Sequence, residues 1–212
     1  PRSTLFPYTT LFRSASSASM PHVTFIGNEE KRLVERLQKG DKSAAREFYA
    51  RYANSLAGIC MRYISDEEDL KDVLQNTLAH IFSHMAEFEY RGMGSLQAWA
   101  KRVVVNESLK FLRTKAHFEV LQDNYDVADE SHDDVPSMGN IPPDALRQML
   151  SRLPIGYRTV LNLYVFEDKS HQEIADLLGI KKNTSASQLY KAKKMLAKMI
   201  RKYNDNNSHD NE

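Results

Sequence analysis

The sequence predicts an all-α protein, built from two small helical domains that an acidic linker joins. Apolar residues recur at steps of three and four through residues 25–116 and again through 143–203, the spacing of helices with one buried face. No segment shows the strict alternation of apolar and polar residues that indicates a strand. Glycine, proline and capping residues divide each region into four helical segments, so each region is expected to form a four-helix unit.

The charges of the chain are unevenly distributed, although its net charge is only +1. Residues 117–142 carry seven acidic side chains and no Lys or Arg, whereas 143–203 carry twelve basic and five acidic side chains. A basic C-terminal module behind an acidic connector points to a polyanionic partner such as nucleic acid.

The first helical region, 25–116, contains several signals for helix ends. Gly40 and Asp41 separate its first two helices, and Ser65 followed by Glu68 is typical of a capping box that opens the third. A glycine-flanked loop at 90–94 ends the third helix, and Ser95 is expected to cap the fourth. Trp99, on this last helix, is expected in the core.

The remaining segments are expected to lie outside the two domains. Residues 117–142 contain proline and glycine breakers as well as the acidic side chains, which predicts a flexible linker. Residues 1–19 show no helical or strand periodicity and are interpreted as a non-native or disordered extension, and 204–212 as a frayed polar tail. Because no long apolar run or secretory signal is found, a cytoplasmic location is expected.

The C-terminal region contains the pattern of a helix-turn-helix. Ser170 and Glu173 form a second predicted capping box, and Gly179 permits the left-handed backbone of a tight turn. In the following helix Ser185, Leu189 and Ala192 are expected to face inward. The opposite face is predicted to enter the major groove of DNA, with base or phosphate contacts from Lys181, Lys182, Asn183, Thr184, Ser187, Gln188 and Lys191.

Together these segments resemble a known family, the extracytoplasmic-function (ECF) group of bacterial RNA polymerase sigma factors in the sigma-70 family. LPIGYRTVLNLYVFEDKSHQEIADLLGIKKNTSASQLYKAKKML is similar to the family's promoter-reading domain. DEEDLKDVLQNTLAHIF is similar to the segment that docks on the polymerase clamp, and GSLQAWAKRVVVNESLKFLRTK to the segment that melts the promoter. The Thr184-Ser185 pair is similar to the version found in Bacteroidetes-type members.

The resemblance implies a transcription initiation factor rather than an enzyme. Such a factor binds the clamp and flap regions of core RNA polymerase, recognises the minus-35 and minus-10 elements of promoter DNA, and allows for an anti-sigma factor as a regulatory partner. The implied docking residues are Asp69, Asp72 and Gln75. The implied minus-10 residues are Tyr90, Arg102, Asn106, Lys110 and Arg113, with the loop at 90–94 shaping a pocket for an extruded base.

Two other functional classes were weighed against this interpretation. His80 and His84, four residues apart and followed by Glu87, have the spacing of metal ligands on a helix, but no catalytic motif accompanies them. No metal and no cofactor is therefore expected. A helix-turn-helix repressor or activator that acts without polymerase is the second alternative, and such a protein typically dimerises on a palindrome.

Overall fold

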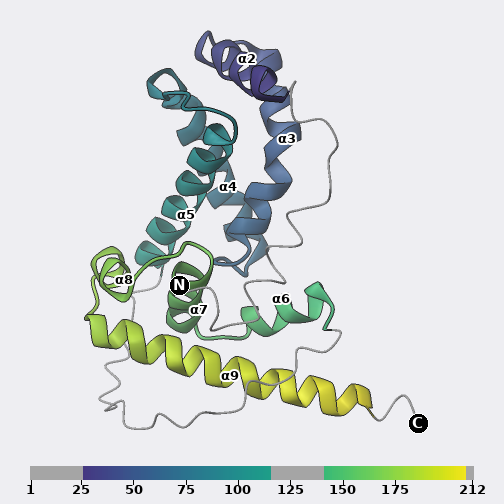
Figure 1. The fold of residues 1–212 in the computed structure, drawn as a ribbon, viewed down its shortest axis with the longest axis vertical. Coiled ribbons are helices and arrows are strands. Elements are labelled where there is room, and N and C mark those ends of the chain that lie inside the picture. The colour runs from purple at the N-terminus through teal and green to yellow at the C-terminus, as the bar shows by residue number, and fades with distance from the viewer. Residues whose placement is uncertain (1–25, 116–140, 209–212) are drawn as a thin grey trace. The chain divides into compact units, whose positions relative to one another are not determined.

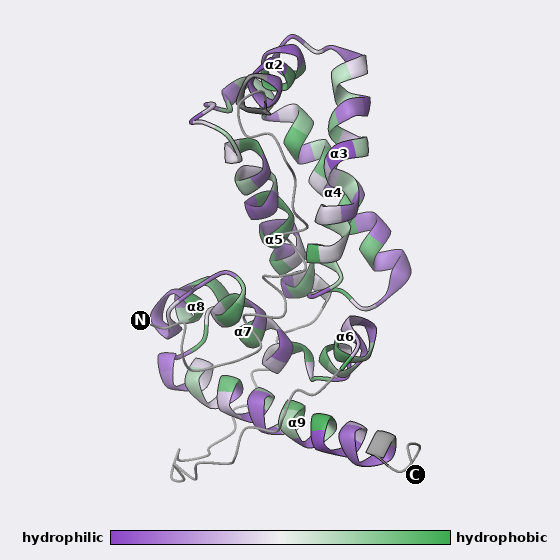
Figure 2. Cartoon of the chain, turned by 45° about the vertical axis from the view of Figure 1, so that its right-hand side comes forward, coloured by the Kyte–Doolittle hydropathy of each residue, from purple (hydrophilic) through white to green (hydrophobic). Residues whose placement is uncertain are grey.

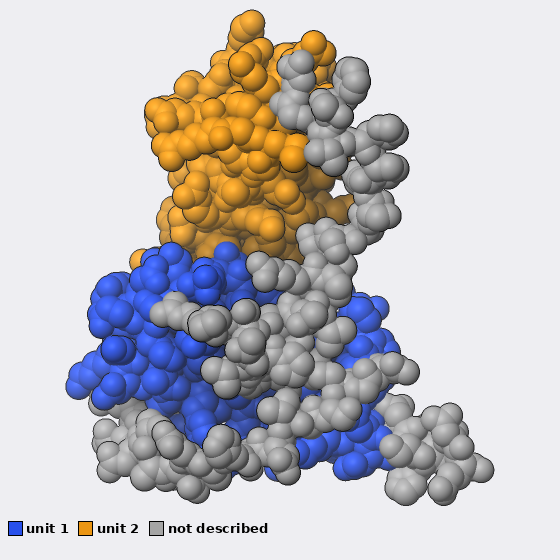
Figure 3. Space-filling model, viewed as in Figure 1, with its two compact units in different colours: residues 1–18, 118–212 blue, residues 19–117 orange. Residues whose placement is uncertain are grey.

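The computed structural model of the protein describes residues 26–115 and 141–208, and all of its described regular elements are helices. The expected extension at 1–19 and most of the expected linker, residues 117–140, lie outside the described residues. The chain divides into two compact units, with the first unit ending at His117 (Figure 3). No described helix is long and apolar enough to cross a membrane.

The first unit contains four α-helices and a short 3-10 helix (Figure 1). They are α2 (Ile26–Gln38), α3 (Lys42–Cys60), α4 (Glu67–Ser83), η2 (Met85–Glu87) and α5 (Ser95–Lys115). Helix α3 packs against α2, α4 and α5, and α4 also packs against α5. Large side chains such as Phe48, Tyr63, Ile81 and Leu96 are fully buried between these helices. The predicted four-helix unit is therefore present.

Helix starts in the first unit differ in detail from the prediction. The N-cap of α4 is Asp66, whose Oδ1 accepts hydrogen bonds from the backbone N of Glu68 at 3.1 Å and of Asp69 at 3.0 Å. The predicted box from Ser65 to Glu68 is therefore wrong by one residue, because the Asp66 carboxylate reaches the first-turn amides. Gly40, with φ of 74°, ends the turn before α3, as predicted.

The second unit contains α6 (Pro143–Ser151), α7 (Ile155–Val165), α8 (His171–Leu178) and α9 (Lys182–Ser208). Helix α9 packs against the other three, and its buried residues are Leu189, Ala192, Leu196 and Ile200. Hydrophilic and hydrophobic residues alternate along α9 in Figure 2, as expected of a helix with one buried stripe. The helix runs beyond Asn204, which the sequence assigned to a frayed tail, because extending an already packed helix is easy once its earlier turns have formed.

Candidate nucleic-acid interface

Helices α8 and α9 form the predicted helix-turn-helix. The backbone N of Glu173 donates to Oγ of Ser170 at 3.2 Å, and the backbone N of Ser170 donates to Oε2 of Glu173 at 2.8 Å. This confirms the capping box. Gly179 ends α8 in the left-handed conformation, with φ of 68° and ψ of 30°, where a side chain would be strained.

The start of α9 presents polar and basic residues on its outer side. Lys181, Lys182 and Asn183 are exposed, and Thr184 and Lys191 are half-buried. These five residues are called the α9 face below. Lysine and the free amides of a helix start are suited to phosphate oxygens, while Thr and Asn side chains can reach base edges.

Two residues predicted for this surface do not lie on it. Gln188 is 7% exposed and packs against α7, and Ser187 is 9% exposed with its Oγ donating to the backbone O of Thr184 at 3.0 Å. The outward placement of both residues was therefore wrong. Gln188 stands three residues after the fully buried Ser185, so it belongs to the same inward stripe.

Tyr190 is a candidate contact residue that the sequence analysis missed. Its ring is half-buried beside Lys194, whose Nζ lies 5.9 Å from the ring centroid. A partly exposed ring with a cation above it offers both an apolar and a charged contact to DNA. An aromatic residue one position before Lys191 was the only sequence signal.

Helix α5 carries a second polar and basic surface, at the spacing that the sequence predicted. Four exposed residues recur about one turn apart. They are called the α5 face and consist of Arg102, Asn106, Lys110 and Arg113. Lys110 lies 3.9 Å from the carboxylate of Glu107, whereas the guanidinium groups are suited to phosphate contacts and the Asn106 amide to a base edge.

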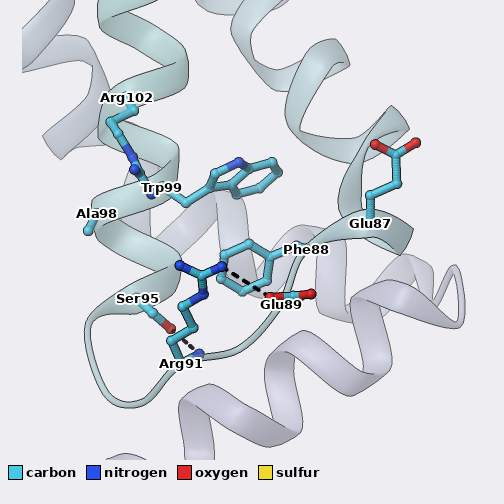
Figure 4. A pocket seen from close by; sticks show the side chains of 8 residues that line it. All are labelled: Glu87, Phe88, Glu89, Arg91, Ser95, Ala98, Trp99 and Arg102. Carbon is cyan, nitrogen blue, oxygen red and sulfur yellow. Dashed lines mark hydrogen bonds and ion pairs between the residues drawn. The ribbon is translucent and has the colours of Figure 1, made fainter.

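An open pocket of about 470 Å³ lies beside the N-terminal end of the α5 face (Figure 4). It is called the Trp99 pocket, and its main lining residues are Glu87, Phe88, Glu89, Arg91, Trp99 and Arg102. Its volume is in the range of small-ligand sites. Carboxylates and guanidinium groups on its walls provide both hydrogen-bond acceptors and donors.

Two aromatic rings form one wall of the Trp99 pocket. The Phe88 and Trp99 ring centroids are 4.9 Å apart at an interplanar angle of 37°. Trp99 is half-buried and lines the pocket, so its expected place in the core was wrong, because Ala100, Val103 and Val104 fill the inner face of α5 instead.

The loop residues complete this site. Arg91 pairs with Glu89 at 3.1 Å, as the dashed line in Figure 4 shows. Tyr90 is half-buried in the loop before α5, and its burial, together with the charge of Glu30, raises its pKa. Phe88, Arg91 and Trp99 were not among the predicted site residues. Their position one turn before Arg102, or in the loop leading to it, was the available signal.

The predicted docking residues lie together near the start of α4. Asp72 and Gln75 are exposed and Asp69 is half-buried, within the first three turns of the helix. They form a polar and acidic surface suited to a basic partner.

The two histidines of the metal alternative contact each other on α4. Their rings stack with centroids 4.2 Å apart, and Nδ1 of His84 lies 3.0 Å from the backbone O of His80. Nδ1 of His80 lies 3.3 Å from Oε1 of Glu107, a carboxylate on α5. These contacts join the last turn of α4 to α5.

Comparison with known proteins decides the family. The family model of Sigma-70 region 2 matches residues 48–118, and that of Sigma-70, region 4 matches 144–196. The ECF RNA polymerase sigma-E factor of Haemophilus influenzae is 29% identical over 182 residues, covering 81% of this chain and 95% of that protein. The chain belongs to the ECF group of sigma-70 factors. It is a transcription initiation factor.

Other comparisons give the same family. The sigma-E factor of Escherichia coli K12 is 26% identical to this sigma factor over 175 residues, covering 77% of this chain and 90% of that protein. Among solved structures, the sigma factor RpoE in complex with the anti-sigma factor NepR from Bartonella quintana matches with 20% identity and a TM-score of 0.44, covering 74% of this chain and 96% of that chain. The family assignment does not favour the repressor alternative.

Proposed function

We propose that this sigma factor directs core RNA polymerase to a two-part promoter by means of two separate DNA-contacting surfaces. The α9 face reads the minus-35 element, and the α5 face with the Trp99 pocket reads and opens the minus-10 element. The factor does this in the cytoplasm and catalyses no reaction of its own. The position of the Trp99 pocket directly beside the α5 face carries this proposal, since melting requires a place for an unpaired base next to backbone contacts.

The α9 face supports duplex recognition in the major groove. Helix α9 follows the tight turn at Gly179, and its exposed N-terminal residues are the ones that a recognition helix directs at base edges. Lys181, Lys182 and Lys191 contact phosphates, which sets the register of the helix. Asn183 and Thr184 then reach the bases.

The Trp99 pocket supports capture of a base from the nontemplate strand. Arg102 lines the pocket and also begins the α5 face, so a strand that follows α5 brings its bases to the pocket mouth. The Trp99 ring offers a stacking surface, and Glu89 and Arg91 offer an acceptor and a donor for one base edge. Binding the extruded base favours the open form of the DNA over the closed duplex.

The acidic start of α4 is the proposed docking surface for core polymerase. Asp69, Asp72 and Gln75 are polar groups at the positive end of a helix, where acidic side chains are stabilised in the free protein. A basic helix on the polymerase would pair with them.

A comparison of two variants tests the division of labour between the surfaces. Asn106→Ala and Lys191→Gln each remove one exposed or half-exposed polar group, from α5 and α9 respectively. Promoters that the wild-type holoenzyme selects are altered at single positions in each element, and initiation is measured. Asn106→Ala is expected to lose discrimination only in the minus-10 element, and Lys191→Gln to weaken binding only through the upstream contact. Equal effects of both variants on both elements would contradict the proposal.

A further inference from the structure

A buried carboxylate from the first helix lies at the start of α5. Glu30 on α2 is 6% exposed, and its Oε2 accepts a hydrogen bond from the backbone N of Gly94 at 2.9 Å. Its Oε1 accepts from the backbone N of Leu96 at 3.0 Å. Gly94, the residue before α5, has no side chain to accept from these amides. The cap of α5 therefore comes from α2, and not from Ser95 as the sequence predicted.

A second residue of α2 holds the other end of the same loop. Nε2 of Gln38 donates to the backbone O of Phe88 at 2.9 Å. Phe88 stacks on Trp99 and lines the Trp99 pocket. The segment from Phe88 to Leu96, which forms one side of the pocket, is thus held at both ends by α2.

The loop between these two anchors has little internal support. Gly92 and Gly94 have φ values of 120° and 84°, in the region that favours glycine. Within the loop, the backbone N of Arg91 donates to Oγ of Ser95 at 3.3 Å, and the backbone N of Ser95 donates to the backbone O of Gly92 at 3.1 Å. Two glycines give such a segment many alternative conformations, so its position depends on contacts from outside.

We propose that Glu30 and Gln38 are positioning residues that set base selection at the Trp99 pocket. They fix the wall that carries Glu89 and Arg91, and Glu30 does so from a buried position. This inference rests on the proposed function of the pocket. Recognition of a base edge requires donors and acceptors held to within a fraction of an ångström, so a loosened wall loses discrimination before it loses binding.

The chemistry of the Glu30 contact makes it sensitive to a single atom. Among the described residues, its carboxylate bonds to two backbone amides at the positive end of α5, where a negative charge is favoured. Glu30→Gln retains one acceptor oxygen but turns an NH2 donor toward the other amide. The variant therefore breaks one anchor with almost no change in volume.

The experiment compares the full-length wild type with Glu30→Gln and with Glu35→Gln, an identical change at an exposed position of the same helix. Amide hydrogen exchange is measured for residues 88–98 in the free protein. Initiation with core polymerase is measured on promoters altered singly in each element. Glu30→Gln is expected to speed exchange at Gly94 and Leu96 about tenfold. It is also expected to reduce discrimination at one minus-10 position about threefold or more, with minus-35 discrimination and affinity for core polymerase unchanged.

Several outcomes would overturn the inference. One is a Glu30→Gln protein with the same loop exchange and the same base discrimination as Glu35→Gln. Another is an equal loss at both promoter elements, because that result would make Glu30 a residue for general stability only. If Glu30→Gln does not fold, Gln38→Ala decides, since Gln38 is exposed. A smaller loss confined to the minus-10 element supports the inference, and wild-type discrimination overturns it.

Failure of the proposed function is recognised separately. In that case the wild type itself would initiate nowhere with core polymerase, and a role for Glu30 in base selection would fall with it. The exchange measurement would still report whether α2 holds the loop.

Discussion

The side-chain amide of Gln188 on α9 lies against Gly156 on α7, so close that a Cβ added to Gly156 would stand 3.3 Å from Oε1 of Gln188. This oxygen is buried, and no donor among the described residues reaches it. Gln188 therefore contributes to the packing of α9 on α7 and does not face the DNA groove.

Replacing Gln188 by methionine is the first test of this placement. Gln188→Met exchanges a buried, unpaired carbonyl for an apolar group of similar length, so the free energy of unfolding is expected to rise by about 1 kcal/mol. Minus-35 base preference is expected to stay unchanged. Chemical denaturation and promoter binding measure the two quantities, with Thr184→Val on the α9 face as the control that alters preference. A stable Gln188→Met protein with altered minus-35 preference would return Gln188 to the reading surface.

The stacking role of Trp99 leads to a second prediction. Trp99→Leu removes the aromatic surface, and the affinity of the holoenzyme for single-stranded minus-10 DNA is expected to fall by about 1–3 kcal/mol. Trp99→Phe keeps a ring and is expected to lose less. Fluorescence anisotropy of labelled DNA measures both. Equal affinity for the Leu and Phe variants would argue against stacking.

Phosphate contact by Lys191 predicts a change in salt dependence. Lys191→Gln is expected to reduce the slope of log binding constant against log salt concentration by about 0.9, the value for one released counterion. Lys202→Gln, an exposed lysine farther along α9, is the control and is expected to leave the slope unchanged. Titrations of minus-35 duplex at several salt concentrations give the slopes. Identical slopes for the two variants would remove Lys191 from the phosphate contacts.

The capping box of α8 predicts a specific pH dependence of stability. Hydrogen bonds from the backbone and hydroxyl of Ser170, and then from Lys169, lower the pKa of Glu173 from its ordinary 4.5 to about 2. Because the folded pKa is the lower one, the stabilisation is present above about pH 4.5 and is lost as the pH falls toward about 2. Denaturation of wild type and Glu173→Gln across this range measures the effect. The stability advantage of the wild type is expected to shrink over the range, and a constant difference would contradict it.

Local signals were the most predictable from the sequence. Ser170, Glu173 and Gly179 lie within ten residues of one another, and their backbone geometry depends mainly on each other. The exposed stripe from Arg102 to Arg113 likewise follows from helical periodicity alone.

Contacts between distant segments were not predictable in this way. Glu30 caps a helix that starts more than sixty residues later, and no local pattern indicates such a contact. The place of Gln188 depends on the small volume of Gly156 on another helix. The Trp99 pocket combines η2, the following loop and α5, so its residues form a site only after the helices have packed.

Transcription in vitro tests the central claim most directly. Residues 20–212 are added to sigma-free bacterial core polymerase with genomic fragments as template, and the transcript starts are sequenced. The expected result is a set of starts that depends on the factor and shares two spaced upstream motifs. If the chain neither binds core polymerase nor yields any factor-dependent start, the account of two promoter-reading surfaces on a sigma factor is contradicted.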